Sequence, residues 1–137
     1  MPNLSKLYFK TALLFLIVGI CMGLQMAITH NHDVTGAHAH ANLLGWVTMA
    51  LFGTYYSLSP ELADLRIAKI QYAIYTTGVV LMVPALYLML KGYSMLEPLV
   101  AISSLITFAG VLLFAYIVFR RDILIQKLSA QANATTS

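Results

Sequence analysis

The chain has 137 residues, of which 60% are hydrophobic and only 9% are charged. Because about a quarter of the residues of a soluble domain are charged, this composition excludes an ordinary soluble domain, and it also excludes a disordered chain. The formal net charge of +3 is too low for a nucleic-acid-binding protein, and the one cysteine, Cys21, cannot form an internal disulfide.

Four apolar stretches follow one another along the chain, and each is long enough to cross about 30 Å of hydrocarbon as a helix. They cover residues 8–28, 37–58, 67–90 and 99–119. Short connections between such helices favour an antiparallel, up-down bundle. The sequence therefore predicts an all-α membrane protein whose single domain, residues 1–121, has four transmembrane helices. Residues 122–137 form a polar tail, and we expect its end, residues 133–137, to be disordered.

The basic side chains are distributed unequally between the two sides that these spans define. One side receives Lys6, Lys10, Arg66, Lys69, Arg120, Arg121 and Lys127, whereas the other side receives only Lys91. Cytoplasmic loops of membrane proteins carry an excess of Lys and Arg, so we expect both termini and the tail in the cytoplasm. The predicted location is a bacterial inner membrane, surrounded by lipid, with the loop between the first two spans outside.

All four histidines of the chain fall between positions 30 and 40. His30 and His32 belong to the outer loop, whereas His38 and His40 lie at the start of the second span. An ionisable side chain in hydrocarbon is costly and is therefore a functional candidate. Neutral imidazole is a ligand for haem iron, copper and zinc. Residues i and i+2 are about 200° apart on an α-helix, so His38 and His40 should serve two different sites on opposite faces.

The first, third and fourth spans contain no histidine. A haem with two axial ligands would need its second ligand from another copy of the chain, from a methionine or from the outer loop, so we expect a homo-oligomer. The small residues Ala39 and Ala41 leave room for a flat macrocycle beside the helix. Asn42 lies one turn after His38 and could hold it by a hydrogen bond, and Trp46 continues that face. The alternative role for these polar residues is hydrogen bonding between helices.

A second hypothesis is a copper-binding or copper-handling membrane protein. Met22, Met26 and His30 recur at intervals of four residues with Cys21 beside them, and His32 adds another imidazole. Thioether, thiolate and imidazole groups are the ligands that suit copper. A third hypothesis is a cofactor-free assembly subunit of a respiratory complex, in which the histidines only join helices.

Residues 36–47, GAHAHANLLGWV, together with residues 52–56, FGTYY, carry a family resemblance. This segment resembles the haem-copper oxidase subunit I superfamily, including its cbb3-type and nitric-oxide-reductase-like branches. It looks most like the short stand-alone proteins related to that subunit. The specific match covers about twenty residues, and the rest of the chain shares only the order of its spans.

The resemblance implies a fold, a cofactor and an assembly. Subunit I of the family has twelve helices in three four-helix arcs, and a His-x-His pair on one helix holds two haems. By resemblance, three copies of this chain would rebuild that layout as a homotrimer, with haem b between His38 of one copy and His40 of the next. Asn42, Gly45 and Trp46 of the matched segment are further candidate cofactor-binding residues.

The implied role is electron transfer with a respiratory-chain redox partner, or binding of a small gas such as NO or O₂. The copper site of the family needs three further histidines, and no matching motif occurs in the other spans. The resemblance therefore implies haem binding rather than catalysis. As an enzyme, the chain would be an oxidoreductase acting on O₂ or NO.

Overall fold

The computed structural model describes residues 1–135, and this part of the chain is built from helices without any strand. Three helical segments are long and apolar enough to cross a membrane. They are α1 (Asn3–Thr29), α5 (Arg66–Leu90) and the stretch Ser94–Phe119, in which the short 3₁₀ helix η2 (Ser94–Leu96) leads into α6 (Glu97–Phe119). The described part of the chain is thus all-helical and has apolar helices of membrane-spanning length, as its composition predicts.

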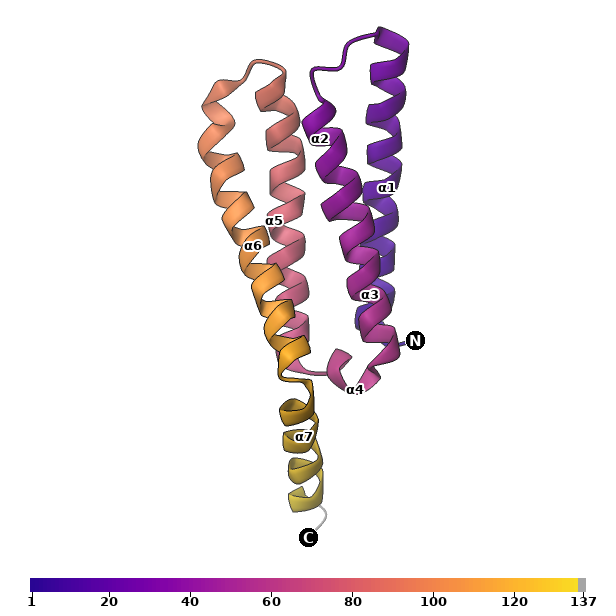
Figure 1. Cartoon of the computed structure of the whole chain (residues 1–137), viewed down its shortest axis with the longest axis vertical. Helices are drawn as coiled ribbons and strands as arrows, with labels where there is room; N and C mark the ends of the chain where they lie inside the picture. The colour runs from indigo at the N-terminus through magenta and orange to yellow at the C-terminus, as the bar shows by residue number, and fades with distance from the viewer. Residues whose placement is uncertain (136–137) are drawn as a thin grey trace.

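The second predicted span is made of three consecutive pieces. They are α2 (Thr35–His40), the π-helix η1 (Ala41–Thr48) and α3 (Met49–Leu58). His40 and Met49, at the two junctions, have right-handed helical backbone angles, so the pieces run on without a break. Figure 1 shows them as one continuous coil beside α1. Each piece alone is shorter than a membrane span, and their sum matches the predicted stretch.

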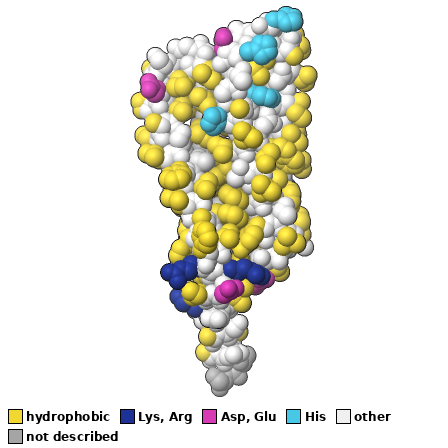
Figure 2. Space-filling view, in the orientation of Figure 1, with side chains coloured by type: hydrophobic (Ala, Val, Ile, Leu, Met, Phe, Trp, Pro, Cys, Tyr) yellow, Lys and Arg dark blue, Asp and Glu magenta, His cyan; other side chains and the backbone are white. Residues whose placement is uncertain are grey.

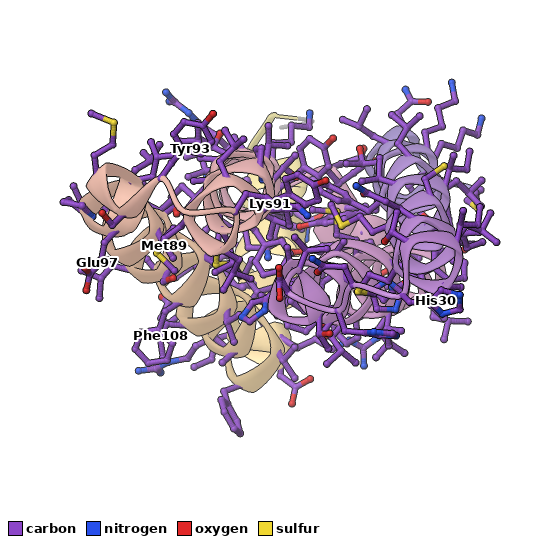
Figure 3. All side chains as sticks on the ribbon, turned by 90° about the horizontal axis from the view of Figure 1, so that it is seen from above. His30, Met89, Lys91, Tyr93, Glu97 and Phe108 are labelled. Carbon is purple, nitrogen blue, oxygen red and sulfur yellow. The ribbon has the colours of Figure 1, made fainter. Side chains whose placement is uncertain are left out.

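Near the top of the molecule in Figure 1 the helices lie in a row, whereas lower down α1 also bonds to α5, and Phe52 of α3 stacks on Phe114 of α6. Helix α6 packs along α5, α5 contacts α2, and α1 packs against η1 and α3. Figure 1 shows this order from left to right near the top of the molecule, and Figure 3 shows the same row from above. Successive long helices run in opposite directions in Figure 1, because the connections between them are short. In α2 itself, Thr35 and His40 are exposed and Ala37 is fully buried.

The two ends of the long helices, at the top and the bottom of Figure 1, differ in chemistry. The starts of α1 and α5 and the end of α6 lie together at one end, where Lys and Arg side chains gather (Figure 2). We call it the basic end. The histidine side chains gather toward the opposite end, which we call the histidine end. Lys91, labelled in Figure 3, follows α5 at the histidine end. The separation of basic residues into two unequal sets, predicted from the sequence, is therefore present in the fold.

A cluster of aromatic rings lies toward the basic end. Tyr8 of α1 stacks on Tyr56 of α3 with ring centroids 5.9 Å apart. Phe52 of α3 stacks on Phe114 of α6 at 4.0 Å and meets Tyr75 of α5 edge to face at 5.0 Å. Aromatic pairs at such distances add to the energy of burial. This aromatic cluster holds the row together at one end and leaves the histidine end more open.

A buried glutamine crosslinks the same region. Tyr8 and Tyr56 both donate their hydroxyl protons to Oε1 of Gln71, and Nε2 of Gln71 donates to the carbonyl of Gly110 at 3.2 Å. The three bonds join α1, α3, α5 and α6 through one amide. A polar group inside an apolar environment is costly unless it is hydrogen-bonded, and Gln71 has partners for both its oxygen and its nitrogen.

The tail departs from the prediction of a frayed end. Residues Arg121–Thr135 form helix α7, which extends beyond the basic end in Figure 1. Arg121 pairs with Glu61 of the short helix α4 (Pro60–Ala63) at 3.2 Å, and Leu124 and Ile125 pack against the core. These contacts order the first turns of α7. The expected disorder is therefore wrong for residues 133–135, and residues 136–137 lie outside the described part of the chain.

Candidate functional site

The His38 imidazole packs against α1 beside Gly19 and Gly23, where that helix carries no side chain. A Cβ atom added to Gly23 would lie only 3.1 Å from Cε1 of His38, so the imidazole occupies space that a larger residue would fill. Nδ1 of His38 lies 2.8 Å from the carbonyl oxygen of Gly19. Because a carbonyl can only accept, Nδ1 is the donor in this contact, and the tautomer of the neutral imidazole that fits it has its lone pair on Nε2.

His40 has the same internal arrangement on a different side of the helix. Its Nδ1 lies 2.7 Å from the carbonyl oxygen of Gly36, one turn earlier, so Nε2 again bears the lone pair. His40 is exposed and lines an open groove of about 240 Å³, which we call the His40 groove. The groove is lined by His40, Leu44, Met82, Ser104, Thr107, Phe108 and Val111.

The two imidazoles therefore face opposite neighbours. His38 contacts α1, whereas His40 faces side chains from α5 and α6. In Figure 3, Phe108 of the His40 groove lies on the α6 side of the row, far from α1. The prediction that the two histidines point to different faces of the second helix is confirmed. Within one chain they cannot bind the same ion.

Asn42 supports the backbone of His38 rather than its ring. Its amide nitrogen donates to the His38 carbonyl at 2.9 Å and lies 3.4 Å from Nδ1 of the same residue. Since Nδ1 already donates to Gly19, it cannot also accept from Asn42. The Asn42 side chain also fills the space above Gly19, where an added Cβ would lie 2.6 Å from it. Asn42 therefore bonds to the His38 backbone, within the helical turn, instead of to the imidazole as expected.

The other two candidates of the matched segment, Gly45 and Trp46, have structural surroundings. An added Cβ at Gly45 would lie 2.4 Å from the ring of Phe15 on α1, so a glycine is required for the two helices to approach. Trp46 is half-buried and packs against the hydrophobic core. Neither residue lines the His40 groove.

The residues considered for copper lie on α1 and in the loop that follows it. His30 ends α1 with a left-handed backbone (φ 53°) and is exposed, as is His32 in the following loop. Met26 is buried, and its sulfur accepts a hydrogen bond from Thr35. Within residues 1–135 there is no group of three or more His, Cys, Asp or Glu side chains that could hold a metal ion. The hypothesis of a copper site that also uses methionine sulfur stays a prediction.

Two further features were not found from the sequence. The first is a groove of about 640 Å³ between α1 and α5, lined by Phe15, Ile17, Val18, Cys21, Met22, Gln25, Val80, Val83, Pro84, Tyr87 and Leu88. Its polar members are joined, because the Tyr87 hydroxyl donates to Gln25 at 2.9 Å. The second is the buried amide of Gln71, whose only sequence signal is a polar residue inside an apolar stretch.

The second helix offers two separate imidazoles as possible ligands, one on each side. Each imidazole presents one unbonded nitrogen, and each ring is held by a backbone carbonyl, as metal-ligating histidines are. The His40 groove is smaller than the roughly 300–1,000 Å³ of pockets that enclose organic ligands, so one chain cannot enclose a haem there. No protein-family model matches the chain, and no curated protein or solved structure matches it either.

Proposed function

We propose that the chain is a haem b-binding, homo-oligomeric membrane protein whose axial ligands are His38 and His40. Four transmembrane helices carry the site, and the second of them is the continuous run of α2, η1 and α3. The role is electron transfer where histidines fill both axial positions, and binding of NO or O₂ where one position stays open. Haem supplies the one-electron chemistry, and the residues of the chain bind and orient it.

The observation that carries this proposal is the contact between Nδ1 of each ring and a backbone carbonyl oxygen. The carbonyls of Gly19 and Gly36 each accept a proton from Nδ1, at 2.8 and 2.7 Å. Each Nε2 is therefore a lone-pair donor in a defined direction, with the ring prevented from turning. A hydrogen bond from the ring nitrogen that does not bind the metal makes the imidazole a stronger ligand. It also selects which nitrogen binds the iron.

The need for more than one copy follows from where the two rings point. His40 opens onto a groove that one chain does not close, and His38 faces the other side of the same helix. A second copy placed over the His40 groove could supply both the missing wall and the second ligand. On the family resemblance, which implies three four-helix arcs, we favour a trimer.

The orientation proposed is cytoplasmic for the basic end and external for the histidine end. Lys and Arg gather at the basic end in Figure 2, and positively charged loops remain on the cytoplasmic side of bacterial inner membranes. The two ligands would then lie toward the outer side of the membrane, where a redox partner or a dissolved gas reaches them.

The proposal is tested by the absorption spectrum of protein purified in detergent from a haem-replete host, recorded oxidised and reduced. We expect a Soret band that is lost or strongly reduced in His38→Ala and in His40→Ala. His32→Ala, which removes an exposed loop imidazole, should leave the band unchanged. Absence of a Soret band from the wild-type protein, or its persistence in both variants, would refute haem binding. Native mass spectrometry then counts the copies, and a dimer would refute the trimer alone.

Copper is the second candidate function, because Met82 lines the same groove as His40, and its sulfur accepts a hydrogen bond from Ser104 of that groove. Imidazole and thioether together suit monovalent copper. Metal analysis of the purified protein separates the two candidates. Stoichiometric copper without haem, lost in Met82→Leu, would favour copper over haem.

A further inference from the structure

The helix that carries both histidines changes its winding directly after them. The π-helix η1 begins at Ala41, the residue that follows His40, and continues to Thr48. Such wide turns make up well under 1% of residues in proteins and often occur at functional sites. The α-helical pieces on either side, α2 and α3, are therefore joined by a segment whose geometry needs support.

Two hydroxyl groups support the centre of this segment. Thr48 donates its hydroxyl proton to the carbonyl of Leu43 at 2.7 Å, five residues earlier on the same helix. Tyr75, on α5, donates to the carbonyl of Leu44 at 3.1 Å. Two successive carbonyls of the wide turn thus receive hydrogen bonds from side chains, one of them from a neighbouring helix.

The phenol of Tyr75 is held in place by its own surroundings. Its side chain is fully buried, and its ring meets Phe52 edge to face at 5.0 Å. On the opposite side, an added Cβ at Gly110 would lie 2.8 Å from the Cα of Tyr75, so α6 is in direct contact with this part of α5. The packing around the ring therefore holds the Tyr75 hydroxyl beside the Leu44 carbonyl.

We propose that Tyr75 is a positioning residue, which holds the π turn through the Leu44 carbonyl and thereby sets the directions of His38 and His40. A π turn contains one residue more than an α turn. Closing it to an α turn would rotate α2 by about 100° relative to α3. His38 would then leave the Gly19 carbonyl, and His40 would leave its groove. The significance of this positioning rests on the proposed function, but the ring directions themselves can be measured without haem.

The test uses haem-free, full-length protein in lipid nanodiscs, with Tyr75→Phe compared with the wild type. Imidazole NMR reports which ring nitrogen carries the proton, and amide hydrogen exchange reports the opening of residues 44–49. We expect the Nδ1-protonated signal of His38 to give way to a mixture of the two tautomers. We also expect exchange about five- to tenfold faster, as the loss of one hydrogen bond implies.

Tyr72→Phe is the matched control. Tyr72 is on the same helix, one turn before Tyr75, and its hydroxyl bonds to Thr11 on α1 instead of to the π segment. The control should keep both the wild-type tautomer of His38 and the wild-type exchange of residues 44–49. Unchanged tautomer and unchanged exchange in Tyr75→Phe would overturn the inference. A change of equal size in both variants would also overturn it, because a general loss of packing would then explain the effect.

A second pair of variants decides the matter if Tyr75→Phe does not fold. Thr48→Val removes the other hydroxyl with little change of shape, whereas Thr48→Ser retains it. We expect Thr48→Val to disturb the His38 tautomer and Thr48→Ser to keep the wild-type tautomer. Equal, wild-type-like signals in both would refute the role of the hydroxyls. A normal tautomer in a wild-type protein that takes up no haem would refute the proposed function and leave this inference standing.

Discussion

Nδ1 of His38 donates its proton to the carbonyl oxygen of Gly19, 2.8 Å away on the neighbouring helix. The contact is possible because α1 presents glycine at positions 19 and 23, which lets the imidazole lie against its backbone. A single interhelical bond thus fixes the side chain's tautomer, its direction and the spacing of the first two helices. Small residues four positions apart are common where membrane helices approach each other. Here Gly19 and Gly23 provide the space that the His38 imidazole occupies.

Replacing Gly23 by a larger residue should displace the His38 imidazole. Gly23→Leu would force side-chain atoms into the space of His38, where even a Cβ would lie 3.1 Å from Cε1. Overpacking of this kind costs about 1–3 kcal/mol of folding free energy. We expect lower thermal stability and loss of the Nδ1-protonated signal of His38. Ala27→Leu, at an exposed position one turn further along α1, is the control and should change neither property. A normal His38 signal in Gly23→Leu would contradict the proposed position of the imidazole against Gly23.

Filling the His40 groove should prevent cofactor binding without unfolding the chain. Ser104 lines the groove and is exposed, so Ser104→Phe adds a ring beside His40 at little cost in packing. We expect the haem-to-protein ratio to fall at least as far as it does in His40→Ala. Ile102→Phe adds bulk at another exposed site of α6 and should keep the wild-type ratio. Full haem loading of Ser104→Phe would show that the cofactor does not approach His40 through this groove.

Removing the buried amide should destabilise the aromatic cluster at the basic end. In Gln71→Leu the hydroxyls of Tyr8 and Tyr56 lose their common acceptor, and the Gly110 carbonyl loses its donor. Each buried unsatisfied group costs about 1–3 kcal/mol, so we expect a loss of about 2–4 kcal/mol in the free energy of unfolding. Tyr56→Phe leaves Gln71 with its other partners and should cost about 1 kcal/mol or less. Equilibrium unfolding in mixed micelles measures both, and a Gln71→Leu protein as stable as the wild type would contradict the role of the amide.

The membrane orientation can be measured with single cysteines. In a Cys21→Ala background, Asn31→Cys places a thiol in the exposed loop at the histidine end, and Asp64→Cys places one at an exposed position of the basic end. A membrane-impermeant thiol reagent added to intact spheroplasts should label the first and not the second. Labelling of Asp64→Cys alone would reverse the proposed orientation, and both thiols should react after the membrane is dissolved.

The positions of the long helices could be predicted from the sequence because hydropathy is a local property. The predicted stretch 67–90 corresponds to α5 (Arg66–Leu90), and 99–119 corresponds to α6 (Glu97–Phe119). Helix α1 begins earlier than predicted, at Asn3, because a helix can continue past the end of an apolar run. Residues 133–135, which were expected to be disordered, continue helix α7. Its polar composition favoured disorder at the end, but α7 is anchored by Arg121 and by apolar contacts with distant segments.

By itself the sequence determined that this is a helical, membrane-like protein and that His38 and His40 point to different faces, because both follow from composition and helical periodicity. Only the tertiary structure decided that the partner of His38 is a backbone carbonyl, that Asn42 holds the turn instead of the ring, and that Gln71 joins four helices. These contacts connect residues far apart in the chain, and they depend on how closely two helices approach. The wide turn at 41–48 belongs to the same class, because its support comes from Tyr75 on another helix.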